Sequence, residues 1–268
     1  MNKKPFHHLP ILMYHDIVLG YRGANPYILD IDEFVRHMEY LSSNHYRSLL
    51  PDHLIKDLTG ISVHTKSLII TFDDSNKSYY EIVFPVLMKY GFKAVFFINT
   101  SCIDCPDCLT WRNLREMRES GMSIQSHGHH HVFLTDLARV GLNDELSESK
   151  SLIETKLGFP VDFISFPGGR FNKSILDRVK GAGYKGVFTS IPSSRQRFDR
   201  GLYIFNRYLI TSDISQKGVE FLVTDNAFYM RKNYFKYRLA GFLKTLLGNR
   251  LYHLIWTVVV KGGPDDET

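Results

Sequence analysis

The sequence predicts an α/β protein whose parallel sheet is closed, or nearly closed, into a barrel with helices outside. Strand-like apolar runs alternate with helical stretches along most of the chain. Several of these runs are followed directly by polar or charged residues. Because the C-terminal ends of the strands share one face of a βα barrel, we expect those residues to meet there. They are His15 and Asp16, Asp73 and Asp74, Asn99, residues 127–131 and residues 167–170.

The first part of the chain supplies three strands and two helices. Asp32 can cap a helix that carries Phe34, Met38 and Leu41 on one face. Pro51 suits the first turn of a second, shorter helix. The expected order is strand 11–17, helix 32–44, strand 46–50, helix 51–58 and strand 67–72.

From here the chain repeats a helix–glycine–strand unit. Gly91, Gly121, Gly158 and Gly183 each stand where a left-handed cap would end a helix, and each is followed by an apolar residue. We expect strands over residues 94–98, 122–125, 162–166 and 185–189, and a last one over 203–210.

The histidines at 127, 129, 130 and 131 are the most informative cluster for function. His127 and His131, four residues apart, can converge on one metal ion from a single loop. Asp73 and Asp74, at the end of a buried strand, offer a third ligand and a neighbouring base. The structural alternatives are a solvated loop and a helix cap or turn.

The chain has three cysteines, Cys102, Cys105 and Cys108. An odd number argues against a disulfide framework. Their spacing is similar to part of a thiolate metal site, but three thiolates need an outside ligand to complete such a site. We favour a reduced loop over a second metal.

The last part of the chain carries the excess positive charge. Residues 226–264 contain seven Lys and Arg and no Asp or Glu, within a chain of net charge +5. Phe235, Leu239, Phe242 and Leu246 repeat at helical spacing. We therefore expect a barrel over residues 1–225 and a basic amphipathic helical extension over residues 226–268. The extension either binds an anionic membrane surface or packs on the barrel, and no motif suggests nucleic acid.

The N-terminal residues predict no signal peptide, because only residues 11–14 form an unbroken apolar run. The longest apolar stretch, residues 251–260, is too short to cross a bilayer. We expect a cytoplasmic protein, either soluble or peripheral at the inner membrane face.

Taken in order, these motifs resemble the polysaccharide deacetylases of carbohydrate esterase family 4, which contain the NodB homology domain. The resemblance covers about residues 8–210. It rests on residues 71–74, on Ser126 and His127 with His131, and on a looser third motif over residues 166–170. Residues 12–15, the helix that carries Phe34, and residues 205–207 are also similar to the cytosolic or exopolysaccharide-related branches. The fold that this implies is a distorted (β/α)7 barrel.

The resemblance implies a metal-dependent hydrolase that removes N-acetyl groups from a polysaccharide or lipid-linked glycan precursor. Asp73 would be the general base, and Asp74, His127 and His131 would bind a divalent ion, usually zinc. The backbone N–H of Gly168 would complete the oxyanion site.

Three departures from the family pattern bear on activity. Ser75 replaces a glycine, Ser165 replaces an arginine that orients the base, and the last motif's catalytic histidine has no counterpart. We expect His15 to replace that histidine as general acid, and Arg170 or Arg207 to orient Asp73. The competing hypothesis is an inactive carbohydrate-binding or scaffolding barrel. An iron oxygenase with the same ligand triad is a weaker alternative.

Overall fold

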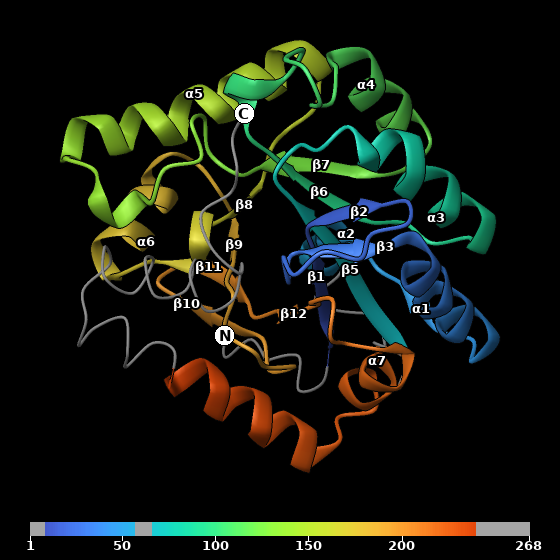
Figure 1. The fold of residues 1–268 in the computed structure, drawn as a ribbon. Helices are drawn as coiled ribbons and strands as arrows, with labels where there is room; N and C mark the ends of the chain where they lie inside the picture. The colour runs from blue at the N-terminus through green and yellow to red at the C-terminus, as the bar shows by residue number, and fades with distance from the viewer. Residues whose placement is uncertain (1–8, 57–65, 240–268) are drawn as a thin grey trace.

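The computed structural model describes residues 9–56 and 66–239, which are built around one large, mostly parallel sheet (Figure 1). The strand order is β10-β11-β9-β8-β7-β6-β5-β1-β12, with β4 paired to β5. Only β10 runs antiparallel to its neighbour, β11. The strands are β1 (Ile11–Tyr14), β4 (Arg47–Ser48), β5 (Ser67–Asp73), β6 (Val95–Ile98), β7 (Ser123–Ser126), β8 (Phe163–Ser165), β9 (Gly186–Phe188), β10 (Arg197–Asp199), β11 (Leu202–Phe205) and β12 (Tyr208–Leu209).

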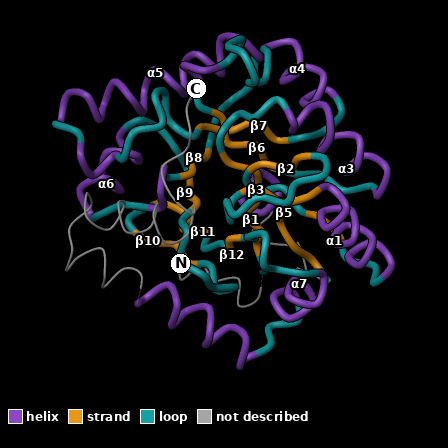
Figure 2. Tube along the Cα trace, in the orientation of Figure 1, coloured by secondary structure: helices purple, strands orange, loops and turns teal. Residues whose placement is uncertain are grey.

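The helices other than α2 lie around the outside of the strands (Figure 2). Leu54 of α2 packs among the side chains inside the barrel. As predicted, α3 and α5 end at Gly91 and Gly158, with φ of 74° and 75°. None of the described helices is long and apolar enough to cross a membrane. They are α1 (Ile31–Ser43), α2 (Pro51–Lys56), α3 (Phe84–Tyr90, preceded by the π-helical turn Tyr79–Val83), α4 (Trp111–Glu119), α5 (Arg139–Leu157), α6 (Lys173–Gly181) and α7 (Gln216–Val223).

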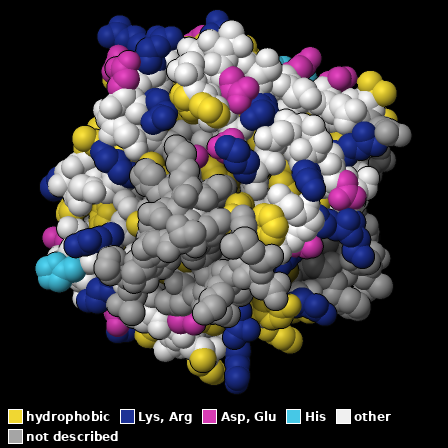
Figure 3. All heavy atoms as spheres, turned by 180° about the vertical axis from the view of Figure 1, so that it is seen from behind, with side chains coloured by type: hydrophobic (Ala, Val, Ile, Leu, Met, Phe, Trp, Pro, Cys, Tyr) yellow, Lys and Arg dark blue, Asp and Glu magenta, His cyan; other side chains and the backbone are white. Residues whose placement is uncertain are grey.

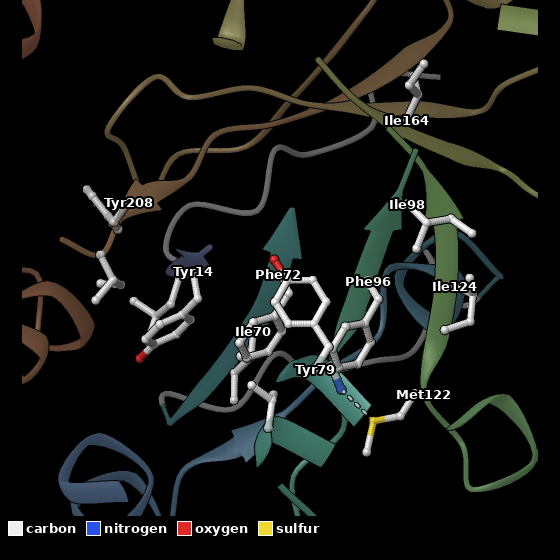
Figure 4. Close-up of a cluster of buried hydrophobic side chains, with 14 of the residues drawn as sticks. Tyr14, Ile70, Phe72, Tyr79, Phe96, Ile98, Met122, Ile124, Ile164 and Tyr208 are labelled. Carbon is white, nitrogen blue, oxygen red and sulfur yellow. Dashed lines mark hydrogen bonds between the residues drawn. The ribbon is translucent and has the colours of Figure 1, made fainter. Parts of the chain in front are cut away.

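The outer face of the sheet packs against these helices through an aromatic and aliphatic cluster (Figure 4). Phe72 of β5 stacks on Phe96 of β6 with ring centroids 5.0 Å apart, and on Tyr14 of β1 at 5.3 Å. All seven residues of β5 are buried. Burial on both faces is the reason that this strand reads as a continuous apolar run.

The inner face closes on itself through a second cluster. Phe97 of β6 and Phe188 of β9 lie 4.8 Å apart, although two strands separate them in the sheet order. Such contacts require the sheet to curl into a barrel filled by side chains. In the described residues no pairing joins β12 to β10, so the barrel stays open along that side. The predicted α/β barrel and its distortion are both confirmed.

Two predicted strands are wrong in detail, because polar residues interrupt both of them: one residue in the first strand and two in the second. The predicted strand 11–17 breaks at His15; its second half is β2 (Asp16–Val18), which pairs with β3 (Ile28–Asp30) in a separate small sheet. The predicted strand 203–210 breaks at Asn206 and Arg207. There the Gln196 side chain accepts from the N–H of Asn206 and donates to its carbonyl, replacing ladder hydrogen bonds.

Two smaller predictions also need adjustment. The strand expected over residues 46–50 is only β4, Arg47–Ser48. The predicted basic extension begins with a helix over residues 227–239, the orange-red helix beside α7 in Figure 1. Residues 240–268 of that extension, and the end of the helix expected over 51–58, lie outside the described residues. Figure 3 shows the face opposite to Figure 1, where charged side chains of both signs are spread over the surface.

Candidate active site and metal centre

Asp74, His127 and His131 converge at the C-terminal ends of β5 and β7. The Nε2 atoms of His127 and His131 lie 3.5 and 3.2 Å from Oδ1 of Asp74. One donor atom from each residue lies within 4.8 Å of the others. Two imidazole nitrogens and one carboxylate oxygen form a donor set that suits a divalent transition metal. These are the three ligands predicted from the sequence.

The Ser165 carbonyl orients His127. It lies 3.0 Å from Nδ1 of His127, so this nitrogen donates, and the neutral imidazole can offer the lone pair of Nε2 to a metal ion. Asp74 and His131 have positive φ angles of 85° and 58°. The backbone is therefore held in an uncommon conformation at two of the three candidate ligands, as is frequent at functional sites.

Glu145, buried on α5, shapes the loop that contains both candidate histidine ligands. Its Oε1 accepts from the N–H groups of His129 and His130, at 2.7 Å each. Gly128 has φ of 87°, and a Cβ there would lie 2.8 Å from the same oxygen. The loop thus needs a glycine at position 128 and a hydrogen-bond acceptor at position 145. Sequence reasoning missed Glu145, since nothing in its spacing distinguishes it from other acidic residues of that helix.

The other two histidines of the cluster face other partners. His129 contacts the Thr100 hydroxyl through Nδ1 at 2.7 Å, and His130 contacts Oε2 of Glu145 through Nδ1 at 3.1 Å. Their hydrogen bonds stabilise the loop rather than extend the ligand set.

Asp74 and the histidines are electrostatically coupled. Burial by itself would raise the pKa of Asp74, but hydrogen bonds from His127 and His131 hold it well below its usual range. The pKa of His131 is raised, chiefly by its hydrogen bond to Asp74. The cluster therefore keeps an ionised carboxylate ready for a cation.

Asp73 does not belong to this cluster; it is buried beside it and paired with Arg207. The guanidinium of Arg207 donates to Oδ1 and Oδ2 of Asp73 at 2.7 and 2.8 Å. Ser165 bridges the pair, donating to Asp73 at 2.8 Å and accepting from Arg207 at 2.7 Å. Burial would raise the pKa of Asp73, but the charges of Arg207 and His127 keep it lowered. Asp73 is thus an ionised carboxylate in a fixed orientation.

Of the two arginines expected to orient Asp73, the structure places Arg207 there. Arg170 instead stacks its guanidinium on the Phe133 ring at 3.9 Å. Arg207 reaches Asp73 from the break between β11 and β12, over a floor of Phe97 and Phe188. Arg207, in the break between β11 and β12, therefore takes the place of the arginine expected at position 165.

Gly168 and Ser75 each have a local structural role. A Cβ at Gly168 would lie 2.4 Å from Cε1 of Phe133, and its φ is 62°. Glycine is therefore needed where the backbone borders the pocket. Ser75, which replaces the family's glycine, accepts from the N–H of Asn99 at 2.8 Å and so joins the ends of β5 and β6.

His15 lines the same pocket as Asp73, Asp74, His127 and His131. Its Nδ1 is buried and has no hydrogen-bond partner among the described residues. Burial lowers its pKa, although the charge of Asp74 acts in the opposite direction. The pocket encloses about 990 Å³ and extends beyond the cluster to α7 and the helix over residues 227–239.

The cysteines lie on a loop that touches both ligand-bearing segments. The Ser101 N–H donates to the His129 carbonyl at 3.0 Å, and the Leu109 N–H donates to the Ser75 carbonyl at 2.8 Å. All three thiols are free. In the described part of the chain, Asp74, His127 and His131 are the one group of three side chains placed to hold a metal.

Comparison with known proteins identifies the family. Residues 60–187 match the family model described as "Polysaccharide deacetylase". The chain is 34% identical over 208 residues to YxkH of Bacillus subtilis (strain 168), which is named as a polysaccharide deacetylase; the match covers 77% of this chain and 73% of YxkH. The chain belongs to the polysaccharide deacetylase family.

Further relatives agree with this assignment. Poly-beta-1,6-N-acetyl-D-glucosamine N-deacetylase of Staphylococcus epidermidis is 23% identical over 219 residues, covering 76% of this chain and 75% of its own. The structure of the Streptococcus pyogenes deacetylase PplD in complex with acetate superposes with a TM-score of 0.75 at 27% identity, covering 82% of this chain and 99% of PplD. The predicted family, fold and hydrolase class are therefore confirmed, and the oxygenase alternative has no support.

Proposed function

We propose that this chain is a zinc-dependent hydrolase that removes the N-acetyl group from an N-acetylated sugar. The observation that carries the proposal is the ionised, buried Asp73 directly beside the group Asp74, His127 and His131 in one large pocket. The Staphylococcus epidermidis relative, named for its action on poly-N-acetylglucosamine, supports an N-acetylhexosamine substrate.

Asp74, His127 and His131 would hold the divalent ion. Three protein ligands with an open position are typical of catalytic zinc sites, which makes zinc the best match. When bound, such an ion polarises a carbonyl and lowers the pKa of water.

Asp73 would act as the general base. Each carboxylate oxygen has two lone-pair directions, so the bonds from Arg207 and Ser165 leave Asp73 able to accept a proton from the attacking water. Arg207 limits the conformational freedom of the carboxylate and stabilises its charge until the proton is transferred.

His15 and Gly168 would complete the reaction. The amide carbon gains the water oxygen, and its oxyanion accepts a hydrogen bond from the Gly168 N–H. As the C–N bond breaks, the leaving amine takes a proton from the imidazolium form of His15, and the proton that Asp73 took from water then restores that imidazolium. Nδ1 of His15 has no hydrogen-bond partner among the described residues. The products are acetate and a free amino sugar.

The substitution Asp73→Asn tests this assignment and separates it from an inactive scaffold. It keeps the three candidate ligands, so bound zinc should remain while amine release from N-acetylglucosamine oligomers falls by roughly 10²–10⁴-fold. A wild-type protein that holds zinc but releases no amine would favour the scaffold. A variant that loses zinc as well would reverse the roles of Asp73 and Asp74.

For the location of the substrate we propose a membrane surface, with the extension that begins at residue 226 as the point of attachment. The helix over residues 227–239 exposes Phe228, Phe235 and Leu239, and it carries Arg231 and Arg238. Basic residues are attracted to the anionic cytoplasmic leaflet by about 1 kcal/mol each. Truncation after residue 225 should abolish sedimentation with phosphatidylserine vesicles while leaving the barrel folded. A full-length chain that ignores such vesicles would refute the attachment.

A further inference from the structure

The active-site pocket has a second compartment whose chemistry differs from that around Asp73. This compartment is lined by one face of the helix over residues 227–239. The lining residues of that helix are Tyr229, Lys232, Asn233, Lys236 and Tyr237. The total volume of about 990 Å³ lies at the upper end of the roughly 300–1,000 Å³ that ligand pockets span. The pocket can therefore take more of a substrate than its acetylated sugar.

Lys232 and Lys236 stand one helical turn apart at this compartment. In the described part of the chain, no acidic side chain forms an ion pair with either lysine. Lys217, which lines the same pocket, differs: both carboxylate oxygens of Glu220 bind it at 3.0 Å. Two like charges at this spacing destabilise a helix slightly, and an anion between them removes that cost. Paired ammonium groups suit a phosphate.

The exposed apolar side chains of the same helix lie next to these lysines. Phe228, Phe235 and Leu239 are 81%, 69% and 47% exposed and follow one another at intervals of seven and four residues. At 100° per residue they form one stripe along the helix. The same rotation places Lys232 between this stripe and Tyr229, which faces the pocket.

We propose that Lys232 and Lys236 bind a phosphate that links the acetylated glycan to a lipid. The sugar then lies at Asp74, His127 and His131, the phosphate lies between the two lysines at the mouth of the pocket, and the lipid chain runs along Phe228, Phe235 and Leu239. The order of the three parts, polar pocket, cationic rim and apolar stripe, matches the order of the parts of such a substrate. This assignment rests on the proposed deacetylation and narrows its substrate class.

Three substrates separate the contribution of the phosphate to kcat/KM from that of the lipid. They are a farnesyl phosphodiester of N-acetylglucosamine, the farnesyl glycoside without phosphate, and N-acetylglucosamine 1-phosphate without lipid. With the zinc-loaded full-length chain, kcat/KM should be about 10–100-fold higher for the phosphodiester than for the glycoside, as expected for charge-assisted contacts. The 1-phosphate should fall between the two.

The double substitution Lys232→Gln with Lys236→Gln should remove most of that preference through KM. Its kcat should change less than about twofold, and its rate on the glycoside should stay constant. The substitutions remove binding of the phosphate, which is equal in the ground state and the transition state, and leave the hydrolytic step unchanged. The matched control is Arg231→Gln with Arg238→Gln, assayed in buffer without vesicles so that the membrane attachment proposed for these arginines plays no part. It removes the same charge from residues that do not line the pocket, and should keep the preference.

Equal kcat/KM values for phosphodiester and glycoside in the wild type would overturn the proposal. So would an equal loss in the lysine and arginine variants, which would indicate general attraction to anions. If the wild type deacetylates none of the three substrates, the proposed reaction is wrong. Calorimetric titration with the phosphodiester then still tests the phosphate site. Even without turnover, the proposal requires the lysine variant to bind the phosphodiester more weakly than the wild type does.

Discussion

Arg207 and Asp73 are joined by two parallel hydrogen bonds of 2.7 and 2.8 Å, although 134 residues separate them in the chain. Both side chains are buried. A buried charge pair of this kind fixes the direction of each partner, and removing one partner leaves the other uncompensated.

Arg207→Gln should therefore reduce both activity and stability. Loss of one partner of a buried pair costs about 3–5 kcal/mol, which urea unfolding would measure. Without the guanidinium the pKa of Asp73 rises, so the acidic limb of kcat/KM against pH should move to higher pH. Arg170→Gln, whose partner is Phe133, is the control and should leave that limb in place. An unchanged limb in the Arg207 variant would exclude Asp73 as the base.

His127→Ala and His130→Ala should differ in bound metal. The first removes a nitrogen that lies 3.5 Å from Asp74, and the second removes an imidazole that contacts Glu145. After dialysis against buffer without zinc, elemental analysis should find zinc in the His130 variant but not in the His127 variant. Equal zinc in both would remove His127 from the ligand set.

His15→Asn should affect amides far more than activated esters. A leaving amine needs a proton, whereas a nitrophenolate ion leaves without one. We expect the rate on an acetylated glucosamine oligomer to fall by roughly 10²-fold or more, and the rate on p-nitrophenyl acetate to change little. Equal losses on both substrates would mean that His15 positions the substrate and does not act as the acid.

His37 makes stability dependent on pH. Its Nε2 donates to the Ile214 carbonyl at 3.2 Å, its Nδ1 accepts from the Tyr14 hydroxyl at 3.2 Å, and burial lowers its pKa to about 4. Because this value lies below that of the unfolded chain, the unfolded state binds the proton more readily. Stability is therefore complete above pH 6.5 and falls between pH 6.5 and about 4, by an amount on the order of 3 kcal/mol.

His37→Gln should flatten this part of the stability curve, measured as the urea midpoint against pH. His45→Asn provides the control, since residue 45 is exposed and its positive φ suits asparagine. A wild-type curve that is flat between pH 6.5 and 4 would contradict the buried neutral state of His37.

The sequence contained the signals for the fold and for the candidate ligand set because both depend on local patterns. Glycine caps and apolar runs mark helices and strands. Asp74 and His127 follow strand ends directly, and His131 lies four residues after His127. The partner of Asp73 was undetermined between Arg170 and Arg207, because the choice depends on a break between β11 and β12. That break is set by hydrogen bonds from Gln196, a contact that no short-range pattern encodes.

The position of Arg207 in the chain has a consequence for biosynthesis. Asp73, Ser165 and Arg207 are translated in that order, and Arg207 follows every strand of the curled sheet except β12. A nascent chain that has emerged only as far as β9 contains all three candidate metal ligands but not the guanidinium that orients Asp73. Such a chain could acquire its metal before it could carry out hydrolysis, so the enzyme would become active only when its last parallel strands join the sheet.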